Sequence, residues 1–188
     1  KGYTPSVFAS LALLLERAGA LDDSSGGGSI TGLYTILVEG DDMSEPVADA
    51  ARGILDGHVI LSRRLAQAGH FPAIDVLHSV SRVADDVSER GHIEARRQIV
   101  RMMAAYREVE ELVQVGAYAS GSSPEADASI AVRERIDGLL RQGKGERTDI
   151  GRAREQMIRI ALESGEDVAR RRAAVGTSGV SAGRGRAA

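Results

Sequence analysis

The sequence predicts an α/β region followed by an all-α region, and three observations lead to this fold class. Short apolar runs rich in β-branched residues alternate with short helical patterns in the first half of the chain. From residue 88 onward, apolar residues recur at three- and four-residue spacing, with glycines at the expected helix ends. Only six of the 188 residues are aromatic, so Leu, Ile, Val and Ala must build the core.

A helix is expected to open the chain. Thr4 is a favourable N-cap residue, and Pro5 occupies the first helical position, where a missing backbone N–H is tolerated. Gly19 ends the pattern. The apolar side of this helix comprises Val7, Phe8, Leu11, Leu14 and Leu15.

A glycine-rich segment at residues 22–28 precedes a predicted buried strand at residues 29–38. Its glycines are compatible with a phosphate cradle, but no Gly-Lys-Ser or Gly-Lys-Thr follows, and a strand rather than a helix comes next. We therefore interpret the segment as a surface loop. The strand leads into an acidic loop at residues 39–46, at the strand end where open α/β sheets bind their ligands.

Two short helices and two extended segments complete the α/β region. The helices are predicted at residues 46–55 and 62–68, and a glycine follows each of them. A strand is predicted at residues 58–61, and an apolar extended run covers residues 70–82.

Three amphipathic helices are predicted in the second half, at residues 88–115, 123–140 and 149–165. Gly116 is the expected C-terminal cap of the first, and the Ser-Pro pair at residues 123–124 opens the second. Together they predict a small helical domain.

These patterns divide the chain into three parts. Residues 1–87 are the end of an α/β core, residues 88–165 are a helical domain, and residues 166–188 are an Arg- and Gly-rich tail that we expect to be disordered. Five arginines and no acid lie between Arg170 and Ala188, which leaves 19 basic and 27 acidic groups before them, a charge of −8. Because a body this acidic lacks a basic patch, nucleic-acid binding is not expected.

Composition excludes other classes of protein. The chain has no cysteine, so it is not a disulfide scaffold, and no run approaches the roughly 20 apolar residues of a membrane helix. The sequence begins with Lys1 rather than Met and shows no signal-peptide pattern. We therefore expect a cytoplasmic protein with a further part upstream of this chain.

Few side chains form a recognisable catalytic or metal-binding pattern. The histidines at positions 58, 70, 78 and 92 do not have the spacing of metal ligands, and no Gly-x-Ser-x-Gly elbow supports a serine nucleophile. Asp41 and Asp42 form an acidic pair in the loop after the first predicted strand. Neighbouring acids in loops are usually solvated, so their spacing alone does not favour a function.

Arg82 stands out because it ends an apolar run that should be largely buried. An arginine in that position needs an anionic partner or an exit to an interface. Two alternatives follow: a local salt bridge, or an arginine finger that presents its guanidinium to a phosphoryl group during transfer.

A set of short segments, in order and with matching spacing over about residues 1–145, resembles the flagellar and type III secretion export ATPases. In the α/β part these segments are residues 3–8 (YTPSVF), 28–31 (GSIT), 38–43 (VEGDDM), 53–58 (GILDGH), 61–63 (LSR), 72–77 (PAIDVL) and 79–83 (SVSRV). In the helical part they are residues 116–118 (GAY), 121–122 (GS) and 140–142 (LRQ), which look like the flagellar branch.

This resemblance implies the C-terminal part of a RecA-like P-loop ATPase core plus a small helical domain, related to the α and β subunits of rotary ATP synthases. It implies a cytoplasmic homohexamer, peripheral at the membrane export apparatus, that hydrolyses ATP with Mg²⁺ to energise flagellar protein export. In the family, the phosphate-binding loop, the catalytic Glu and the Mg²⁺-coordinating Asp lie upstream of the part that this chain resembles. We therefore expect this chain alone to be inactive.

The resemblance also assigns roles to individual residues. Arg82 falls on the arginine finger, which reaches the γ-phosphate bound by the adjacent subunit. Phe71 falls on the aromatic residue that stacks on adenine, and Tyr118 lies in the helical segment that we expect near the same base. The loop at residues 41–46 falls where the hexamer faces its central channel.

The resemblance implies several partners as well: a central stalk-like export protein, stator or regulator proteins, export substrates with their chaperones, and a membrane export gate. Two alternatives stay open. One is an injectisome type III secretion ATPase, and the other is a non-catalytic nucleotide-site or assembly module.

Overall fold

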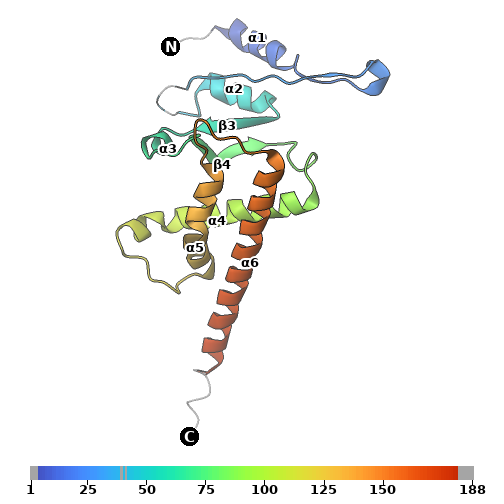
Figure 1. Cartoon of the computed structure of the whole chain (residues 1–188). Helices are drawn as coiled ribbons and strands as arrows, with labels where there is room; N and C mark the ends of the chain where they lie inside the picture. Colours follow the sequence, from blue (N-terminus) through green and yellow to red (C-terminus); the bar gives the residue numbers. More distant parts are fainter. Residues whose placement is uncertain (1–3, 39, 41, 182–188) are drawn as a thin grey trace. The chain divides into compact units, whose positions relative to one another are not determined.

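The computed structural model describes residues 4–38, 40 and 42–181. Figure 1 shows the order of the elements, in which short helices and strands come first and three long helices follow. The chain divides into two compact units. The first comprises residues 1–58 and 81–83, and the second comprises residues 59–80 and 84–188. The predicted fold class, α/β followed by all-α, is confirmed.

The first unit contains two helices and a small β-hairpin. Helix α1 (Pro5–Leu15) begins at the predicted Thr4-Pro5 cap and packs on α2 (Pro46–Ile54), whose Ala48 and Ala51 are buried. Strands β1 (Gly19–Ala20) and β2 (Ser29–Ile30) pair in antiparallel fashion around the short 3₁₀ helix η1 (Asp23–Ser25). The segment at residues 22–28 therefore connects the two strands as a mostly exposed loop, in agreement with the predicted surface loop.

The predicted buried strand over residues 29–38 is wrong in its extent and its burial. Only Ser29–Ile30 is β-structure, and Leu33 and Leu37 are 94% and 89% exposed. The physical reason is that an apolar strand needs neighbouring strands on which to pair and pack. Within the described residues, β2 pairs with β1 alone.

Strands β3 (Gly57–Leu61) and β4 (Ile74–Ser81) form a second two-stranded sheet, joined by α3 (Arg63–Gln67). The N–H of Ser62, just after β3, donates to the carbonyl of Ala73, just before β4, at 2.8 Å. At the other end, Arg82 N–H donates to Asp56 O at 2.7 Å. The end of β3 thus meets the start of β4, so the strands run antiparallel.

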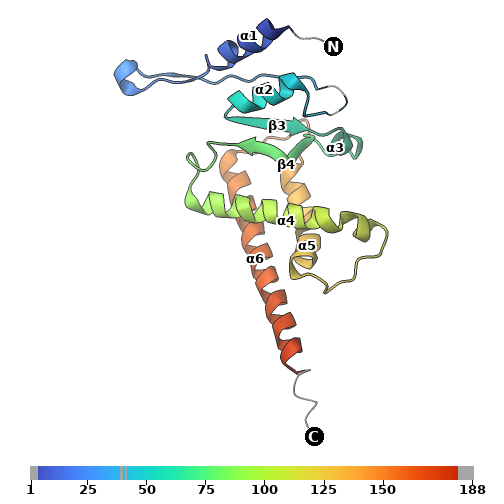
Figure 2. The ribbon, with the colours of Figure 1, turned by 180° about the vertical axis from the view of Figure 1, so that it is seen from behind.

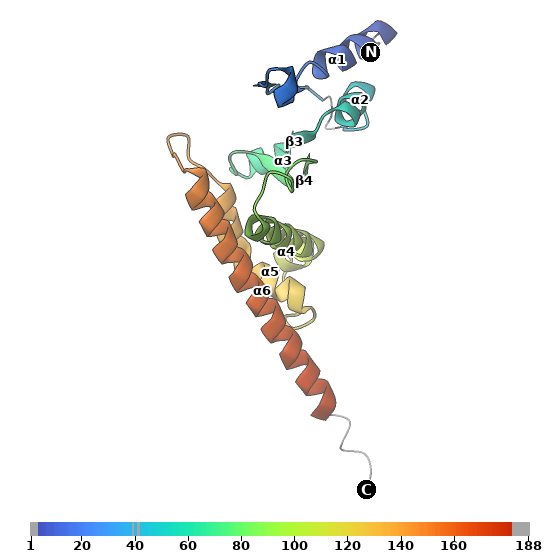
Figure 3. The same ribbon diagram turned by 90° about the vertical axis from the view of Figure 1, so that its right-hand side faces the viewer.

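The second unit is dominated by helices α4 (Arg90–Gln114), α5 (Pro124–Leu140) and α6 (Ile150–Ser181), which pack against one another in all three pairings. Figure 2 shows α4 beside both of the others, and Figure 3 shows α6 running past the end of α5. Their shared core consists of Ala95, Ile99, Met102, Ala128, Val132, Ile136, Ile160 and Ala161. Gly116, with φ of 70°, follows the C-cap of α4 as predicted.

Helix α6 does not end near Gly165, so the expectation of disorder from residue 166 is wrong as far as Ser181. Arg171 pairs with Asp167 one turn earlier, and Arg172 pairs with Glu125 of α5. These contacts support the helix beyond the glycine, because ion pairs at i,i+4 spacing and cross-helix pairs offset the low helix propensity of glycine. Residues 182–188 lie outside the described part. None of the described helices is long and apolar enough to cross a membrane.

Candidate functional site

Arg82 lies immediately after β4, where its side chain is exposed. Its guanidinium Nη2 is 3.5 Å from the carbonyl oxygens of both Arg52 and Gly53, near the C-terminal end of α2. A cation suits that place because the carbonyls at a helix end carry partial negative charge. Both contacts are long for hydrogen bonds, so the guanidinium is held weakly and is accessible.

The alternative of a local salt bridge is not supported at Arg82. Among the residues that the structure describes, Arg82 forms no ion pair, that is, no carboxylate oxygen lies within 4.0 Å of its guanidinium nitrogens. The main chain, by contrast, is fixed by the 2.7 Å bond from Arg82 N–H to Asp56 O. The residue thus combines an anchored backbone with a charge that has no carboxylate partner in the described part.

Phe71 lies between α3 and β4, and its ring is 55% exposed. Its carbonyl oxygen accepts the backbone N–H of Gln142 at 2.9 Å, which places the loop after α5 beside it. An exposed aromatic face next to a polar loop can receive a flat heterocycle by stacking.

The loop beside Phe71 is held by its own contacts and by His70. His70 is 4% exposed, and burial followed by the charge of Arg141 lowers the pKa of its imidazole. Arg141 Nε donates to His70 Nδ1 at 3.4 Å, so the imidazole is neutral and accepts at that nitrogen. Further along, Gly143 N–H donates to Glu146 Oε2 at 2.9 Å.

The position of Gln142 beside Phe71 was not predicted from the sequence, because the two residues are 71 positions apart. The local signal of an exposed loop was the Gly-Lys-Gly run at residues 143–145.

Tyr118 lies elsewhere in the second unit. Its hydroxyl donates to Asp127 Oδ1 at 3.0 Å, and Gly121 N–H donates to Oδ2 of the same carboxylate at 2.8 Å. Asp127 is in the first turn of α5, whereas Gln142 and Phe71 meet just after its last residue. A helix of this length, 17 residues, spans about 25 Å. The structure therefore does not bring Tyr118 next to Phe71.

The acidic loop before α2 is described only in part. Asp41 lies outside the described residues. Asp42 Oδ1 accepts Ser44 N–H at 2.9 Å and Ser44 Oγ–H at 2.5 Å, and these bonds lower the pKa of the carboxyl group. Asp42 therefore serves a turn that leads into α2. In the part of the chain that is described, no group of three or more acids and histidines forms a metal site.

Comparison with known proteins gives a separate family match for each half of the chain. Residues 1–81 match the nucleotide-binding domain of the ATP synthase alpha/beta family, and residues 88–159 match the C-terminal domain of the type III secretion ATPase EscN. The flagellum-specific ATP synthase of Treponema pallidum is 48% identical over 90% of this chain and 36% of its own length. A type 3 secretion system ATPase of Pseudomonas syringae pv. tomato is 42% identical over 86% of this chain and 35% of its own length.

Solved structures agree with these relatives. The assembled ATPase EscN from the type III secretion system of enteropathogenic E. coli superposes with a TM-score of 0.79 and 40% identity, covering 86% of this chain and 38% of that one. The same ATPase in complex with its central stalk EscO gives a TM-score of 0.74 at 38% identity, covering 86% of this chain and 37% of that one. This chain thus spans about a third of the length of the curated relatives that it matches.

Proposed function

Because this chain belongs to the ATP synthase alpha/beta family, as the C-terminal part of a flagellar or type III secretion export ATPase, we propose that the complete protein hydrolyses ATP at the subunit interfaces of a homohexamer. Hydrolysis energises the export of flagellar proteins. The observation that carries this proposal is the geometry of Arg82: an anchored backbone, an exposed guanidinium and two weak carbonyl contacts.

Arg82 acts as an arginine finger on the nucleotide held by the neighbouring subunit. Phosphoryl transfer spreads negative charge over the γ-phosphate oxygens, and a guanidinium placed there stabilises that charge more than the ground state. Exchanging two long bonds to carbonyl oxygens for short bonds to phosphate is favourable, because hydrogen bonds between charged partners are stronger. The planar fork of arginine suits this role better than lysine.

Phe71 stacks on the adenine base, and the loop that includes Gln142 borders the same pocket. The contact from Gln142 N–H to Phe71 O supports this role because it keeps the polar groups of the loop beside the ring. ATP and Mg²⁺ would be held mainly by the phosphate-binding loop and acids expected upstream, while this chain supplies the base platform and the finger. Tyr118, which we expected near the base, instead supports the loop between α4 and α5 through Asp127.

The partners are proposed by analogy. EscN is known assembled and in complex with a central stalk; this chain would likewise face a stalk-like export protein with its loop at residues 41–46. We also propose stator or regulator proteins, export substrates with chaperones, and a peripheral cytoplasmic position at the membrane export gate. The higher identity to a flagellar relative, 48% against 42% for an injectisome relative, favours the flagellar assignment.

Substitution of Arg82 in the complete protein tests this function. Arg82→Ala and Arg82→Lys should each lower kcat by about 10³–10⁵-fold, the contribution of such fingers in GTPases, while ATP affinity stays within a few-fold. Removing Mg²⁺ with a chelator should abolish turnover, and adding it back should restore it. If Arg82→Ala leaves turnover per folded hexamer unchanged, the finger is refuted. If the unsubstituted complete protein binds ATP without hydrolysing it, the non-catalytic alternative is correct.

A further inference from the structure

The loop after α5 is attached at two neighbouring points to the residues that follow α3. Arg141 Nε donates to His70 Nδ1 at 3.4 Å, and Gln142 N–H donates to Phe71 O at 2.9 Å. Two consecutive residues of the loop thus hold two consecutive residues of the segment between α3 and β4. All four residues belong to the second compact unit. Two attachments fix the orientation of the loop as well as its distance from Phe71.

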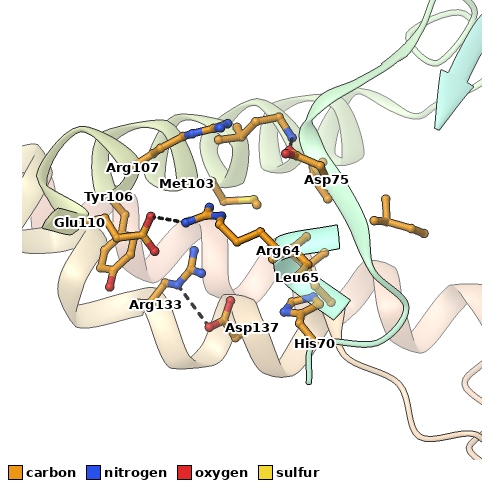
Figure 4. A pocket seen from close by; sticks show the side chains of 14 residues that line it. Arg64, Leu65, His70, Asp75, Met103, Tyr106, Arg107, Glu110, Arg133 and Asp137 are labelled. Atoms are coloured by element: carbon orange, nitrogen blue, oxygen red, sulfur yellow. Dashed lines mark hydrogen bonds and ion pairs between the residues drawn. The ribbon is translucent and has the colours of Figure 1, made fainter. Parts of the chain in front are cut away.

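His70 is a firm anchor for this attachment. It is 4% exposed, and its backbone N–H donates to the carbonyl oxygen of Leu65 in α3 at 2.9 Å. Figure 4 shows its ring at a cavity of about 50 Å³, which Asp137 of α5 also lines. Leaving a buried acceptor without a donor is costly. Removal of Arg141 therefore costs more than the loss of one long hydrogen bond.

The side chain of Arg141 lies between the imidazole and a carboxylate of α5. Its backbone N–H donates to Asp137 O at 2.9 Å, and its Nη2 lies 4.0 Å from Asp137 Oδ2. The same carboxylate pairs with Arg133, whose Nε is 3.2 Å from Oδ2. Burial, followed by the charge of Arg141, lowers the pKa of His70, and the opposing charge of Asp137 does not reverse this. The imidazole is therefore neutral at neutral pH and accepts the bond from Arg141.

The loop itself contains a small closed turn at residues 142–146. Gly143 N–H donates to Glu146 Oε2, and Glu146 N–H donates to Gly143 O, both at 2.9 Å. Gln142 Nε2 donates to Glu146 O at 3.3 Å. Because residues 141–149 are exposed, packing contributes little to their position. The two attachments to His70 and Phe71 therefore set where the turn lies.

We propose that Arg141 is a positioning residue for the nucleotide: through His70 it holds the turn at residues 142–146 as a rim beside the exposed ring of Phe71. Arg141 itself contacts neither base nor phosphate. A rim that is ordered in advance removes the entropic cost of ordering the loop on binding, which favours affinity for ATP and leaves the chemical step unchanged. The inference rests on the proposed function for the adenine at Phe71, and on the contacts of His70 and Arg141 for the rim itself.

Steady-state kinetics of the complete protein tests the effect on nucleotide binding. Arg141→Met removes the donor and keeps an apolar stem, so KM for ATP should rise by about 2- to 10-fold, the equivalent of one hydrogen bond, with kcat within about two-fold. Arg141→Lys retains a donor and should bring KM back toward the unsubstituted value. The control is Arg152→Gln, because Arg152 pairs locally, with its Nε 3.4 Å from Asp149 Oδ2. It should leave KM unchanged.

A double-variant cycle shows whether Arg141 acts through His70. His70→Leu removes the acceptor and keeps apolar bulk, so it should raise KM about as much as Arg141→Met does. The combination should be no worse than either change alone, because both remove the same contact. His70→Asn keeps a carbonyl acceptor near the position of Nδ1 and should stay closer to the unsubstituted value. Independent effects that multiply in the double variant would overturn the link through His70.

Hydrogen exchange measured by mass spectrometry reports the attachment without ATP. In the complete protein, Arg141→Met should speed exchange of the bonded amides of Gln142, Gly143 and Glu146 by about 2- to 10-fold, with the bundle core unchanged. Unchanged exchange in this turn, or faster exchange throughout the bundle, overturns the proposal. Faster exchange of the turn in an active enzyme whose KM for ATP does not rise overturns it equally.

The two proposals fail in distinguishable ways. A complete protein that does not bind ATP, or in which Phe71→Ala leaves KM unchanged, contradicts the proposed base contact, while the exchange experiment still decides whether Arg141 holds the turn. If Phe71→Ala raises KM and Arg141→Met does not, only the positioning role is contradicted.

Discussion

Tyr118→Phe removes one hydroxyl from a partly buried network and should destabilise the helical bundle without affecting ATP binding. Asp127, 8% exposed, accepts this hydroxyl at 3.0 Å and keeps Gly121 N–H at 2.8 Å and Arg171 at 3.6 Å when the hydroxyl is lost. A hydrogen bond to a charged group contributes about 1.5–3 kcal/mol. Because two partners remain, we expect the lower end, about 1.5 kcal/mol.

Urea unfolding of this chain, followed by circular dichroism, measures that loss. With a denaturant slope of about 1–3 kcal/mol/M, the midpoint should fall by about 0.5–1.5 M. The matched control is Tyr106→Phe, since the contact of Arg133 with that ring, 4.5 Å from its centroid, does not need the hydroxyl. Its midpoint should barely move. An unchanged midpoint for Tyr118→Phe, combined with a raised KM for ATP in the complete protein, would refute the structural role of the hydroxyl. It would instead support the expected position of Tyr118 near the adenine base.

Three further predictions concern the base platform, the core and pH. Phe71→Ala in the complete protein should raise KM for ATP by roughly 5- to 150-fold, the equivalent of about 1–3 kcal/mol of stacking, whereas Phe71→Tyr should stay near the unsubstituted value in the same steady-state assay. Met102→Ala empties a site with 0% exposure and should lower the free energy of unfolding by about 2–5 kcal/mol in urea titrations; a loss below about 1 kcal/mol would contradict the packing. The hydrogen bond from Arg172 lowers the pKa of Glu125 below its ordinary value of 4.5, so this pair stabilises the fold above pH 4.5 and the contribution disappears as the pH falls through the lowered pKa. Stability measured against pH should therefore fall less steeply below pH 4.5 in Glu125→Gln than in the unsubstituted chain.

The helices were predictable because their signals are local. Pro5 and Pro124 each follow a favourable cap residue, and Gly116 adopts the positive φ that ends α4. Gly165, in contrast to Gly116, lies within α6, where the Arg171–Asp167 pair supports the next turn of the helix. A glycine marks a helix end only when no later contact favours continuation.

The candidate site was predictable in its residues and not in its contacts. Arg82 and Phe71 were identified by position in an apolar run and by resemblance. The carbonyls that Arg82 approaches are 29 and 30 residues away, and Gln142 is 71 residues from Phe71, so no local pattern indicates either contact. The prediction of a strand at residues 29–38 was wrong for a related reason, because a strand forms only where other strands pair with it, and a local pattern does not reveal those strands.

The most direct test of the central claim is complementation between two inactive forms of the complete protein. One carries Arg82→Ala, and the other has its phosphate-binding loop disabled by substitution of the lysine expected upstream. If Arg82 acts on the neighbouring subunit, mixed hexamers contain interfaces that pair an intact loop with an intact finger. In a randomly mixed ring with head-to-tail contacts, these are roughly a quarter of the interfaces, so turnover should recover toward a quarter of the unsubstituted rate. If native mass spectrometry shows that mixed hexamers assemble and they still hydrolyse no ATP, the claim that Arg82 acts on the neighbouring subunit is contradicted.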